Sequence, residues 1–226
     1  MGRVGAKIAV RQVIIHLGKL AMIPQVLHFL LLDVEAGQYE GHLQTWSKLN
    51  PEYKIHIWDQ DKLRREAWYG PYGSLRLTPY NISLVREMLR YQILFQYGGV
   101  IIDESYVCLR PLEGWLLDTN FFAAYENEYI RPGLISSSVV GAVQGTEFFK
   151  IISKRLEEAL NSSDSRLPKS MGANFLTERI YSVRPGITIY PSHYFFPVHF
   201  SGFVYNGSGQ IFAKHFPIKE QAALSL

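Results

Sequence analysis

The hydrophobic residues in the first part of the chain follow three different spacings. IPQVLHFLLL (23–32) is almost continuously apolar, which is typical of a strand buried on both faces of a sheet. YEGHLQTWSKLNP (39–51) has apolar residues at helical spacing and ends on Asn-Pro, which indicates a helix that stops there. YKIHIWD (53–59) alternates at every second residue. These spacings predict a strand, a helix and a second strand.

The following segment predicts two more helices and a third strand. DQDKLRREAW (59–68) starts at an aspartate suited to an N-cap. SLVREMLRYQILFQY (83–97) places its apolar residues on one helical face, and Gly98-Gly99 terminates the helix. VIIDESYVCL (100–109) reads as one strand. This order predicts an α/β fold, with a mostly parallel central sheet flanked by helices.

The second half of the chain is less regular. FFAAYENE (121–128) predicts a strand that ends in acids, and TEFFKIISKRLEEALNSS (146–163) predicts an amphipathic helix. NFLTERIYSV (174–183) predicts another helix. ITIYPSHYFFPVHF (187–200) and GQIFAKHF (209–216) predict strands or extended segments.

Composition narrows the class of protein. The 226 residues are 47% hydrophobic, so the chain can bury a sizeable core. The net charge of +3 is too small to argue for nucleic acid, and no Lys/Arg-rich run supports such a partner. A single cysteine, Cys108, excludes an intramolecular disulfide and is expected to be a buried apolar residue.

The chain shows no internal repeat and no low-complexity linker, which predicts one domain over residues 22–226. Residues 1–21 are interpreted as an N-terminal extension that is an extra helix, a leader or an added segment. No apolar run is long enough to span a bilayer. These features predict a protein without a membrane segment and favour the cytoplasm over a secretory lumen.

Acids at strand ends are the first candidates for chemistry. Asp103 and Glu104 follow an apolar run, and Glu126 and Glu128 end another predicted strand. Ligands of parallel sheets bind beyond the carboxyl ends of the strands, so these acids are expected at one ligand-binding edge. From the residues alone, Asp103 and Glu104 fit a solvated strand end equally well.

Three sequence blocks together carry a resemblance to a known family. IPQVLHF (23–29), TWSKLNPEYKIHIWD (45–59) and RYQILFQYGGVIIDES (90–105) resemble the DXD-type sugar transferases of the GT-A fold. That family includes capsular-polysaccharide and mannosyl-chain-initiating transferases and, more distantly, the glucosyltransferase domains of large clostridial toxins. The resemblance extends from about Ile23 to His215.

The resemblance implies a GT-A-like, Rossmann-like single domain. It also implies a glycosyltransferase that moves a sugar from a nucleotide diphosphate sugar, with UDP or GDP, to a glycan or another hydroxyl acceptor. Mn²⁺ or Mg²⁺ is the cofactor that it implies. The cation would neutralise the diphosphate leaving group as the glycosidic bond breaks.

The family's motif residues carry over to particular positions. Glu87 and Arg90 stand where the family has an acid and an arginine that hold the donor sugar and nucleotide. Asp103 matches the first DXD aspartate, which contacts ribose and metal. Ser105 replaces the last DXD aspartate, the main metal ligand, and His215 matches a late histidine near the phosphates or metal. The metal ligands implied are therefore Asp103, Ser105 and His215.

Further contacts to the nucleotide sugar are implied by the same resemblance. Leu31 replaces the aromatic residue that packs on the base, and Ser137 and Gly172 are counterparts of segments that line the sugar pocket. His28 is included without a catalytic role, because its surroundings are also typical of a core histidine. The full set is His28, Leu31, Glu87, Arg90, Gly98, Gly99, Asp103, Glu104, Ser137 and Gly172.

Relatives retain the anomeric configuration, so they need no dedicated base. The catalytic candidates are therefore Asp103 and, if the reaction inverts the configuration, Glu126 or Glu128 as the base. Ser105 leaves three outcomes open for the metal. Asp103 holds it with Glu104 or His215, Ser105 ligates it directly or through water, or the site works without metal or is inactive.

Two other functions compete with a transferase. The first is a non-catalytic nucleotide-sugar or glycan-binding module with a degenerate DXD motif. The second is a nucleotidyltransferase, which would need a glycine-rich, basic phosphate loop after the first strand. LLLDVEAGQ (30–38) is a poor match to such a loop.

Overall fold

The computed structural model describes residues 22–32, 34, 37–66, 82–161 and 171–216. The predicted N-terminal extension, residues 1–21, lies outside the described residues. The division into an extension and a domain over 22–226 therefore stays a prediction. Within the described ranges, no helix is both long enough and apolar enough to cross a membrane.

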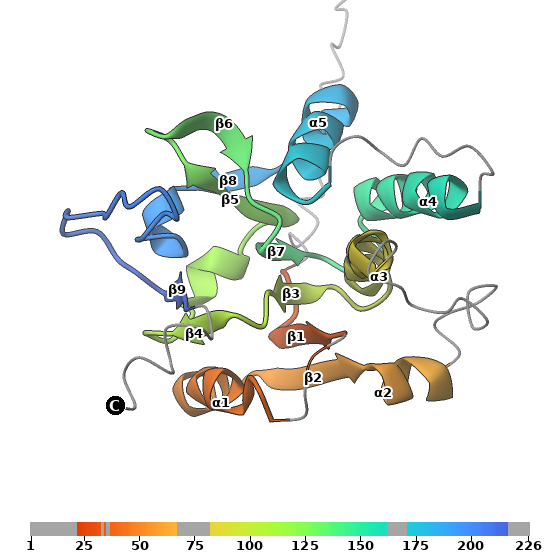
Figure 1. Cartoon of the computed structure of the whole chain (residues 1–226), viewed down its shortest axis with the longest axis horizontal. Coiled ribbons are helices and arrows are strands. Elements are labelled where there is room, and N and C mark those ends of the chain that lie inside the picture. The colour runs from red at the N-terminus through yellow and green to blue at the C-terminus, as the bar shows by residue number, and fades with distance from the viewer. Residues whose placement is uncertain (1–21, 33, 35–36, 67–81, 162–170, 217–226) are drawn as a thin grey trace, which may run out of the picture.

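Figure 1 shows helices and strands in alternation along the first half of the chain. The elements are β1 (Val26–Leu31), α1 (Glu40–Leu49), β2 (Lys54–Asp59), α2 (Gln60–Arg65), α3 (Ile82–Tyr97), β3 (Gly99–Ile102), β4 (Tyr106–Cys108), η2 (Gly114–Leu117), β5 (Phe121–Asn127), β6 (Arg131–Ile135), β7 (Val139–Ala142), α4 (Glu147–Asn161), α5 (Ala173–Val183), β8 (Thr188–Tyr190), η3 (Ser192–Tyr194) and β9 (Ala213–His215).

The central sheet has seven strands in the order β2-β1-β3-β7-β5-β6, and β8 pairs with β5 outside this path. β1 is parallel to β2 and β3, and β8 is parallel to β5. β7 is antiparallel to both β3 and β5, so β3 and β5 point the same way. β6 also opposes β5. The predicted α/β fold with a mostly parallel central sheet is confirmed.

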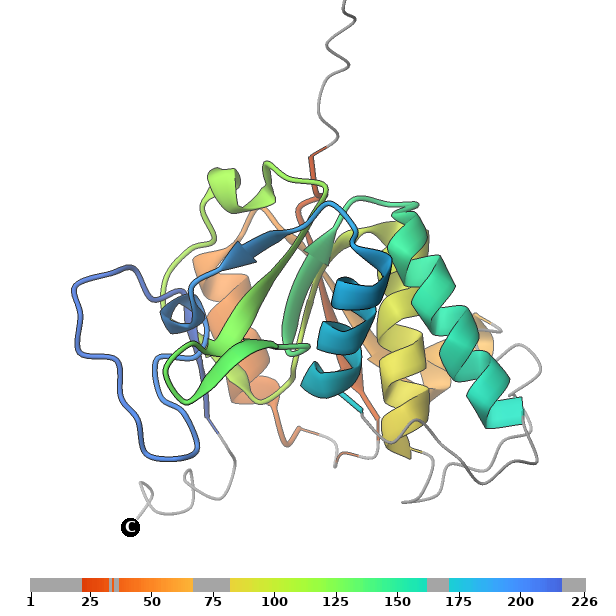
Figure 2. The same ribbon diagram turned by 90° about the horizontal axis from the view of Figure 1, so that it is seen from above.

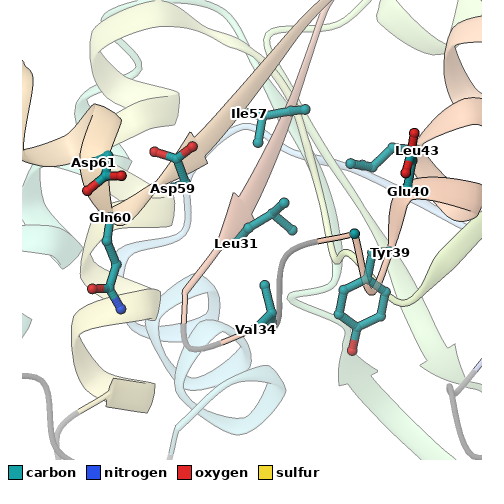
Figure 3. Close-up of a pocket in the computed structure, with 10 residues that line it drawn as sticks. Leu31, Val34, Tyr39, Glu40, Leu43, Ile57, Asp59, Gln60 and Asp61 are labelled. Carbon is teal, nitrogen blue, oxygen red and sulfur yellow. The ribbon is translucent and has the colours of Figure 1, made fainter.

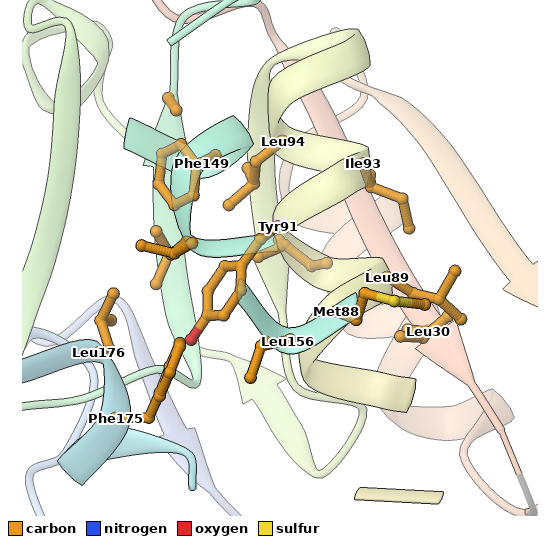
Figure 4. Packing of buried hydrophobic residues seen from close by; sticks show 14 of the residues in the cluster. Leu30, Met88, Leu89, Tyr91, Ile93, Leu94, Phe149, Leu156, Phe175 and Leu176 are labelled. Atoms are coloured by element: carbon orange, nitrogen blue, oxygen red, sulfur yellow. The ribbon is translucent and has the colours of Figure 1, made fainter. Parts of the chain in front are cut away.

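Both faces of the sheet are covered, and each face has its own core. Ile101 points into the core formed with α3, α4 and α5, whereas Val100 and Ile102 point into the core on the side of α1 and η2. Figure 2 shows α3, α4 and α5 gathered on one side of the sheet. Figure 4 shows how Tyr91 of α3 joins them, and its ring lies 5.9 Å from that of Phe149 and 6.2 Å from that of Phe175.

Local signals explain several element boundaries. The carboxylate of Asp59 accepts a hydrogen bond from the Lys62 amide at 2.6 Å, so the predicted N-cap of α2 is confirmed. Gly98 ends α3 with φ at +64°, and its amide donates to the Leu94 carbonyl at 2.9 Å. Cys108 is buried, as predicted.

The prediction of one strand over residues 100–109 is wrong. β3 stops at Ile102, and the chain turns so that the Tyr106 amide donates to the Asp103 carbonyl at 3.1 Å. β4 then leaves the central sheet and pairs antiparallel with β9 in a separate two-stranded sheet. The apolar pattern continues through the turn because Tyr106 and Cys108 enter the same core as Val100 and Ile102. Hydrophobic periodicity alone therefore misses the break.

Candidate functional site

Asp103 is the first residue after β3 and lies at the carboxyl edge of the central sheet. Its amide donates to the Ser138 carbonyl at 2.8 Å, which ties it to the loop before β7. Its Oδ1 accepts two hydrogen bonds from Ser105, from the hydroxyl at 2.7 Å and from the amide at 3.3 Å. These hydrogen bonds orient the carboxylate of Asp103, and the Asp103 side chain remains 27% exposed.

Arg90 of α3 lies against the other oxygen of Asp103. Its Nη1 is 3.6 Å from Asp103 Oδ2, and its Nη2 donates to the Ser138 carbonyl at 3.2 Å. Its Nε is buried and has no partner within the described residues. Burial opposes ionisation of Asp103, but Arg90 and the hydrogen bonds from Ser105 outweigh it and lower the pKa of Asp103. Asp103 is therefore a carboxylate at neutral pH.

Glu104 points toward a different cation. Its carboxylate pairs with Arg86, whose Nη2 also donates to the Leu32 carbonyl at 2.7 Å. Burial and the charge of Asp103 raise the pKa of Glu104, although Arg86 opposes this shift. Sequence reasoning missed Arg86, and the available signal was its position one helical turn before Arg90 on α3.

Glu87 is buried on α3, where the charges of Arg86 and Arg90 both act on its carboxylate. Its Oε2 accepts a hydrogen bond from the Tyr91 hydroxyl at 2.6 Å. Burial raises the pKa of Glu87, while Arg90 and the Tyr91 hydroxyl act against that shift. The structure brings Glu87, Arg90 and Asp103 together, as the family resemblance implied.

β9 brings His215 alongside the segment of residues 103–105. His215 is the register partner of Tyr106, and the Phe216 amide donates to the Ser105 carbonyl at 2.8 Å. The His215 and Tyr106 ring centroids are 5.4 Å apart. Across the described part of the chain, no group of three or more His, Cys, Asp or Glu side chains could hold a metal ion. Metal binding by Asp103, Ser105 and His215 stays a prediction.

The residues at this edge fit a cation only in part. Asp103 offers one oriented, partly exposed carboxylate, and Ser105 offers a hydroxyl beside it. Mg²⁺ is usually bound through one or two carboxylates together with substrate phosphates, so a complete protein cage is not required. The donor set fits an ion that is shared with a diphosphate.

The two acids at the end of β5 have different environments. Glu126 Oε1 lies 3.1 Å from Arg131 Nη1 and 3.5 Å from His199 Nε2. Glu128 Oε1 accepts a hydrogen bond from the Ser192 amide at 2.9 Å, which anchors η3. Burial raises the pKa of Tyr106, and the charges of Asp103 and Glu126 add to this shift. β3 and β5 point the same way, and residues 136–138 bind both Ala124 of β5 and Asp103, so Glu126 and Asp103 lie at the same edge of the sheet.

A hollow of about 870 Å³ opens beyond the carboxyl ends of β1 and β2, between the first turns of α1 and α2 (Figure 3). Leu31 and Ile57 form part of its wall, and Tyr39 stands at its α1 side. Burial and the charges of Glu104 and Asp103 raise the pKa of Tyr39, so the α1 side of the hollow faces residues 103 and 104. The residues that line it are Leu31, Val34, Gly37, Tyr39, Glu40, Leu43, Ile57, Asp59, Gln60 and Asp61.

His28, Gly98 and Gly99 are not brought to this edge. Trp58 Nε1 donates to His28 Nδ1 at 3.0 Å, and His28 Nε2 lies 2.8 Å from the Gly98 carbonyl. Gly99 has φ at +89°, and a Cβ there would lie 2.6 Å from the Val26 carbonyl oxygen. These residues pack near the amino end of β3, and their contact with a nucleotide sugar stays a prediction.

Ser137 and Gly172 lie next to each other at the start of α5. A Cβ at Gly172 would be 3.6 Å from Ser137 Oγ. Ser137 precedes Ser138, whose carbonyl binds both Arg90 and the Asp103 amide. These two residues therefore border the same edge as Asp103, as their assignment to a sugar pocket requires.

Residues 38–122 match the glycosyltransferase sugar-binding region containing the DXD motif. The sugar-binding region includes Arg86, Arg90 and the Asp103–Ser105 segment, so the resemblance to DXD-type sugar transferases is confirmed. Glu126, Ser137, Gly172 and His215 lie outside the matched residues.

Relatives of this chain include mannosyltransferases. Inositol phosphoceramide mannosyltransferase 2 of Schizosaccharomyces pombe is 26% identical over 150 residues, which is 62% of this chain and 40% of the relative. An initiation-specific alpha-1,6-mannosyltransferase of Candida albicans is 32% identical over 104 residues, which is 43% of this chain and 26% of the relative. The chain thus spans less than half the length of these relatives.

Solved glycosyltransferase structures share the fold. An enzyme involved in glycosylation of the major capsid of PBCV-1 superimposes with a TM-score of 0.56 at 10% identity, over 88% of this chain and 98% of that chain. The PaToxG glycosyltransferase superimposes with a TM-score of 0.52 at 12% identity, over 73% and 71% of the respective chains. The GT-A-like character expected from sequence agrees with these neighbours.

Proposed function

We propose that the protein is a glycosyltransferase that moves a sugar from a nucleotide diphosphate sugar to a hydroxyl group of a glycan or another acceptor. The observation that carries this proposal is the oriented carboxylate of Asp103, held by Arg90 and Ser105 beside an open hollow at the carboxyl edge of the sheet. The family match and the mannosyltransferase relatives support it, and their names favour mannose as the sugar.

The hollow beside β1 and β2 has the size and chemistry for the nucleoside part of the donor. Leu31 and Ile57 offer apolar surface to a flat base, and the nearby acids offer acceptors for ribose hydroxyls. Asp103 then lies where ribose and diphosphate follow. Ser137 and Gly172 border the adjoining space for the sugar.

Asp103 and Ser105 would hold Mn²⁺ or Mg²⁺ together with the diphosphate oxygens of the donor. Such a cation supplies charge neutralisation of the leaving diphosphate. The buried guanidinium of Arg90 keeps Asp103 ionised for this task, since it lowers the pKa of Asp103 against the effect of burial.

The proposed transfer has a simple balance of bonds. The acceptor oxygen forms a bond to the anomeric carbon, and the bond from that carbon to the diphosphate oxygen breaks. The nucleoside diphosphate leaves with the electron pair and takes the proton of the acceptor hydroxyl. The protein orients both substrates at this edge and needs no dedicated base when configuration is retained.

Calorimetric titration of UDP- and GDP-sugars, with and without Mn²⁺, tests the proposal. We expect micromolar binding by the wild type and a loss of about 100-fold in affinity for Asp103→Ala, because that variant loses the oriented carboxylate. Glu147→Gln is the matched control, since Glu147 forms only an exposed ion pair with Lys150 on α4. Absence of binding to every nucleotide sugar by the wild type would overturn the proposal.

Ser105 favours one second candidate, a non-catalytic nucleotide-sugar-binding module. A serine in place of the last DXD acid removes one carboxylate ligand, which weakens metal binding and transfer more than binding of the nucleotide. Release of nucleoside diphosphate, measured on the samples used for calorimetry, separates the two candidates. Binding without any release would favour the module.

A further inference from the structure

Glu126 is held at one of its two carboxylate oxygens. Arg131 Nη1 and His199 Nε2 both approach Oε1, at 3.1 Å and 3.5 Å. The described residues provide no hydrogen-bond partner for Oε2. The side chain is 14% exposed, so the carboxylate is largely enclosed while one oxygen stays free to accept.

His199 reaches Glu126 from a distant part of the chain. It lies on a hairpin of residues 197–205, in which Val198 bridges Val204 and the Tyr205 amide donates to the Pro197 carbonyl at 2.7 Å. The His199 side chain is only 2% exposed. We refer to residues 197–205 as the C-terminal hairpin. It is the blue loop beside β6 in Figures 1 and 2.

The C-terminal hairpin also fixes which nitrogen of His199 carries the proton. The Ser201 amide donates to Nδ1 at 3.2 Å, and the Ser201 hydroxyl lies 2.7 Å from the same atom. A backbone amide can only donate, so Nδ1 is an acceptor and Nε2 carries the hydrogen. Nε2 therefore donates toward Glu126 Oε1, and Ser201 sets this direction.

A second contact holds the C-terminal hairpin against the turn that follows β5. The rings of Phe203 and Tyr129 stack with centroids 5.4 Å apart and planes at 28°. The His199 amide donates to the Phe203 carbonyl at 2.8 Å within the hairpin. This aromatic contact makes no use of Glu126, so the hairpin can be loosened without removal of the donor to Glu126.

Glu126 also lies close to the proposed donor site. The Ser136 amide donates to the Ala124 carbonyl at 2.8 Å and the Asp103 amide donates to the Ser138 carbonyl at 2.8 Å, so residues 136–138 join the end of β5 to Asp103. Asp103 follows β3 and Glu126 lies at the end of β5, and these strands point the same way in the sheet. Glu126 thus lies on the β5 side of Asp103, whereas the nucleoside hollow lies on the β1 and β2 side.

We propose that His199 is a positioning residue for acceptor hydroxyl groups and acts through Glu126. With Arg131, it holds Oε1 so that Oε2 accepts a hydrogen bond from a neighbouring hydroxyl of the acceptor. In hydrolysis, Oε2 accepts from the hydrogen of the attacking water that does not pass to the leaving diphosphate. The inference rests on the proposed glycosyltransferase function. It assigns Glu126 and His199 to the acceptor side of that site. Orientation of an attacking group by a fixed acceptor commonly accounts for at least one order of magnitude in rate.

Hydrolysis of the donor sugar, with water as the acceptor, tests the inference without knowledge of the natural acceptor. His199→Phe keeps a ring but removes the Nε2 donor, whereas His199→Gln keeps an N–H that can reach Oε1. We expect kcat for hydrolysis of UDP- or GDP-mannose to fall about 10-fold in His199→Phe, with KM for the donor unchanged. We expect His199→Gln to stay within about 3-fold of the wild type.

Phe203→Leu is the matched control for a merely structural role. It loosens the C-terminal hairpin through loss of the stack on Tyr129 and leaves the His199 donor in place. We expect its kcat to remain near that of the wild type. A second check is the pair Glu126→Gln and Glu126→Gln/His199→Phe, which should have equal rates because His199 acts only through that carboxylate.

Three results would overturn the inference. One is an unchanged kcat in His199→Phe, and another is an equal fall in Phe203→Leu. The third is a wild type that binds the donor and does not hydrolyse it. A wild type that binds no nucleotide sugar in calorimetry overturns the proposed function itself, and so the two failures are distinguishable.

Discussion

Ser105 shows how one substitution changes the chemistry of a motif. In the family pattern its position is an acid that binds metal, but here its hydroxyl donates to Asp103 Oδ1 at 2.7 Å. The hydrogen bond stabilises the Asp103 carboxylate and helps to lower its pKa. Ser105 thus supports the ionised state of its neighbour, whether or not it also contacts a cation.

His28 makes the stability of the fold depend on pH. Burial lowers the pKa of His28 from 6.5 to about 4, and the ring is enclosed between Trp58 and Gly98. The unfolded chain takes up a proton near pH 6.5 that the folded protein takes up only near pH 4. The stabilisation is therefore complete above pH 6.5 and is lost as the pH falls through this window.

We expect this histidine to contribute about 3 kcal/mol to the change in unfolding free energy between about pH 7 and about pH 4. Urea unfolding at several pH values would measure that slope for the wild type and for His28→Gln. The variant lacks the titrating ring, so its unfolding free energy should fall less over the same range. Parallel curves for the two proteins would contradict this prediction.

At the scale of elements, the glycine pair before β3 sets how closely three strands approach. Gly99 has φ at +89° and touches β1, where a Cβ would lie 2.6 Å from the Val26 carbonyl oxygen. Gly98 has φ at +64° and touches the end of β7, where a Cβ would lie 2.9 Å from the Ala142 carbonyl oxygen. The pair both ends α3 and allows β3 to enter the sheet between its neighbours.

Gly99→Ala should therefore destabilise the protein more than a positive φ alone explains. Gly145 is the matched control, because it has φ at +80° and no described atom lies within 4 Å of the place that an added methyl group would occupy. We expect Gly145→Ala to cost roughly 1–2 kcal/mol and Gly99→Ala to cost at least about 3 kcal/mol. Chemical denaturation measures both, and equal losses would show that backbone strain, not close approach, dominates.

Long elements were predictable from sequence, whereas short ones were not. α3 and α4 have enough residues for helical spacing to be visible, and β1 has the apolar run of a buried strand. β6 and β7 have five and four residues on either side of a serine run, which is too short for periodicity to identify them. The break between β3 and β4 is invisible because both strands face one core.

At the scale of the whole molecule, the site depends on contacts between distant segments. Asp103 was predictable because it directly follows an apolar strand. His199 was not predictable as a neighbour of Glu126, since 73 residues separate them and a hairpin brings them together. Arg86 likewise reaches Glu104 only because α3 packs across the end of β3.

The two sheets should differ in local stability. β1 and β3 are central strands with helices over the sheet, whereas β4 and β9 pair through three residues each in the small sheet. We expect amide hydrogens in β4 and β9 to exchange about 100-fold faster, or more, than those of Val100 and Ile101. Hydrogen exchange followed by NMR measures this, and equal protection of both sheets would contradict it.

The junction between the two sheets at residues 103–105 ties the candidate site to a segment more than 100 residues further along the chain. The Asp103 amide donates a hydrogen bond to the Ser138 carbonyl, just before β7 of the central sheet. The Ser105 carbonyl accepts a hydrogen bond from the Phe216 amide, just after β9. A chimera that exchanges residues 209–216 for those of a relative would thus alter the surroundings of the carboxylate, and it would also replace Phe212 and Ala213, which are buried in the core on the side of α1. A change in this short late segment would therefore reach the candidate site and one of the two cores together.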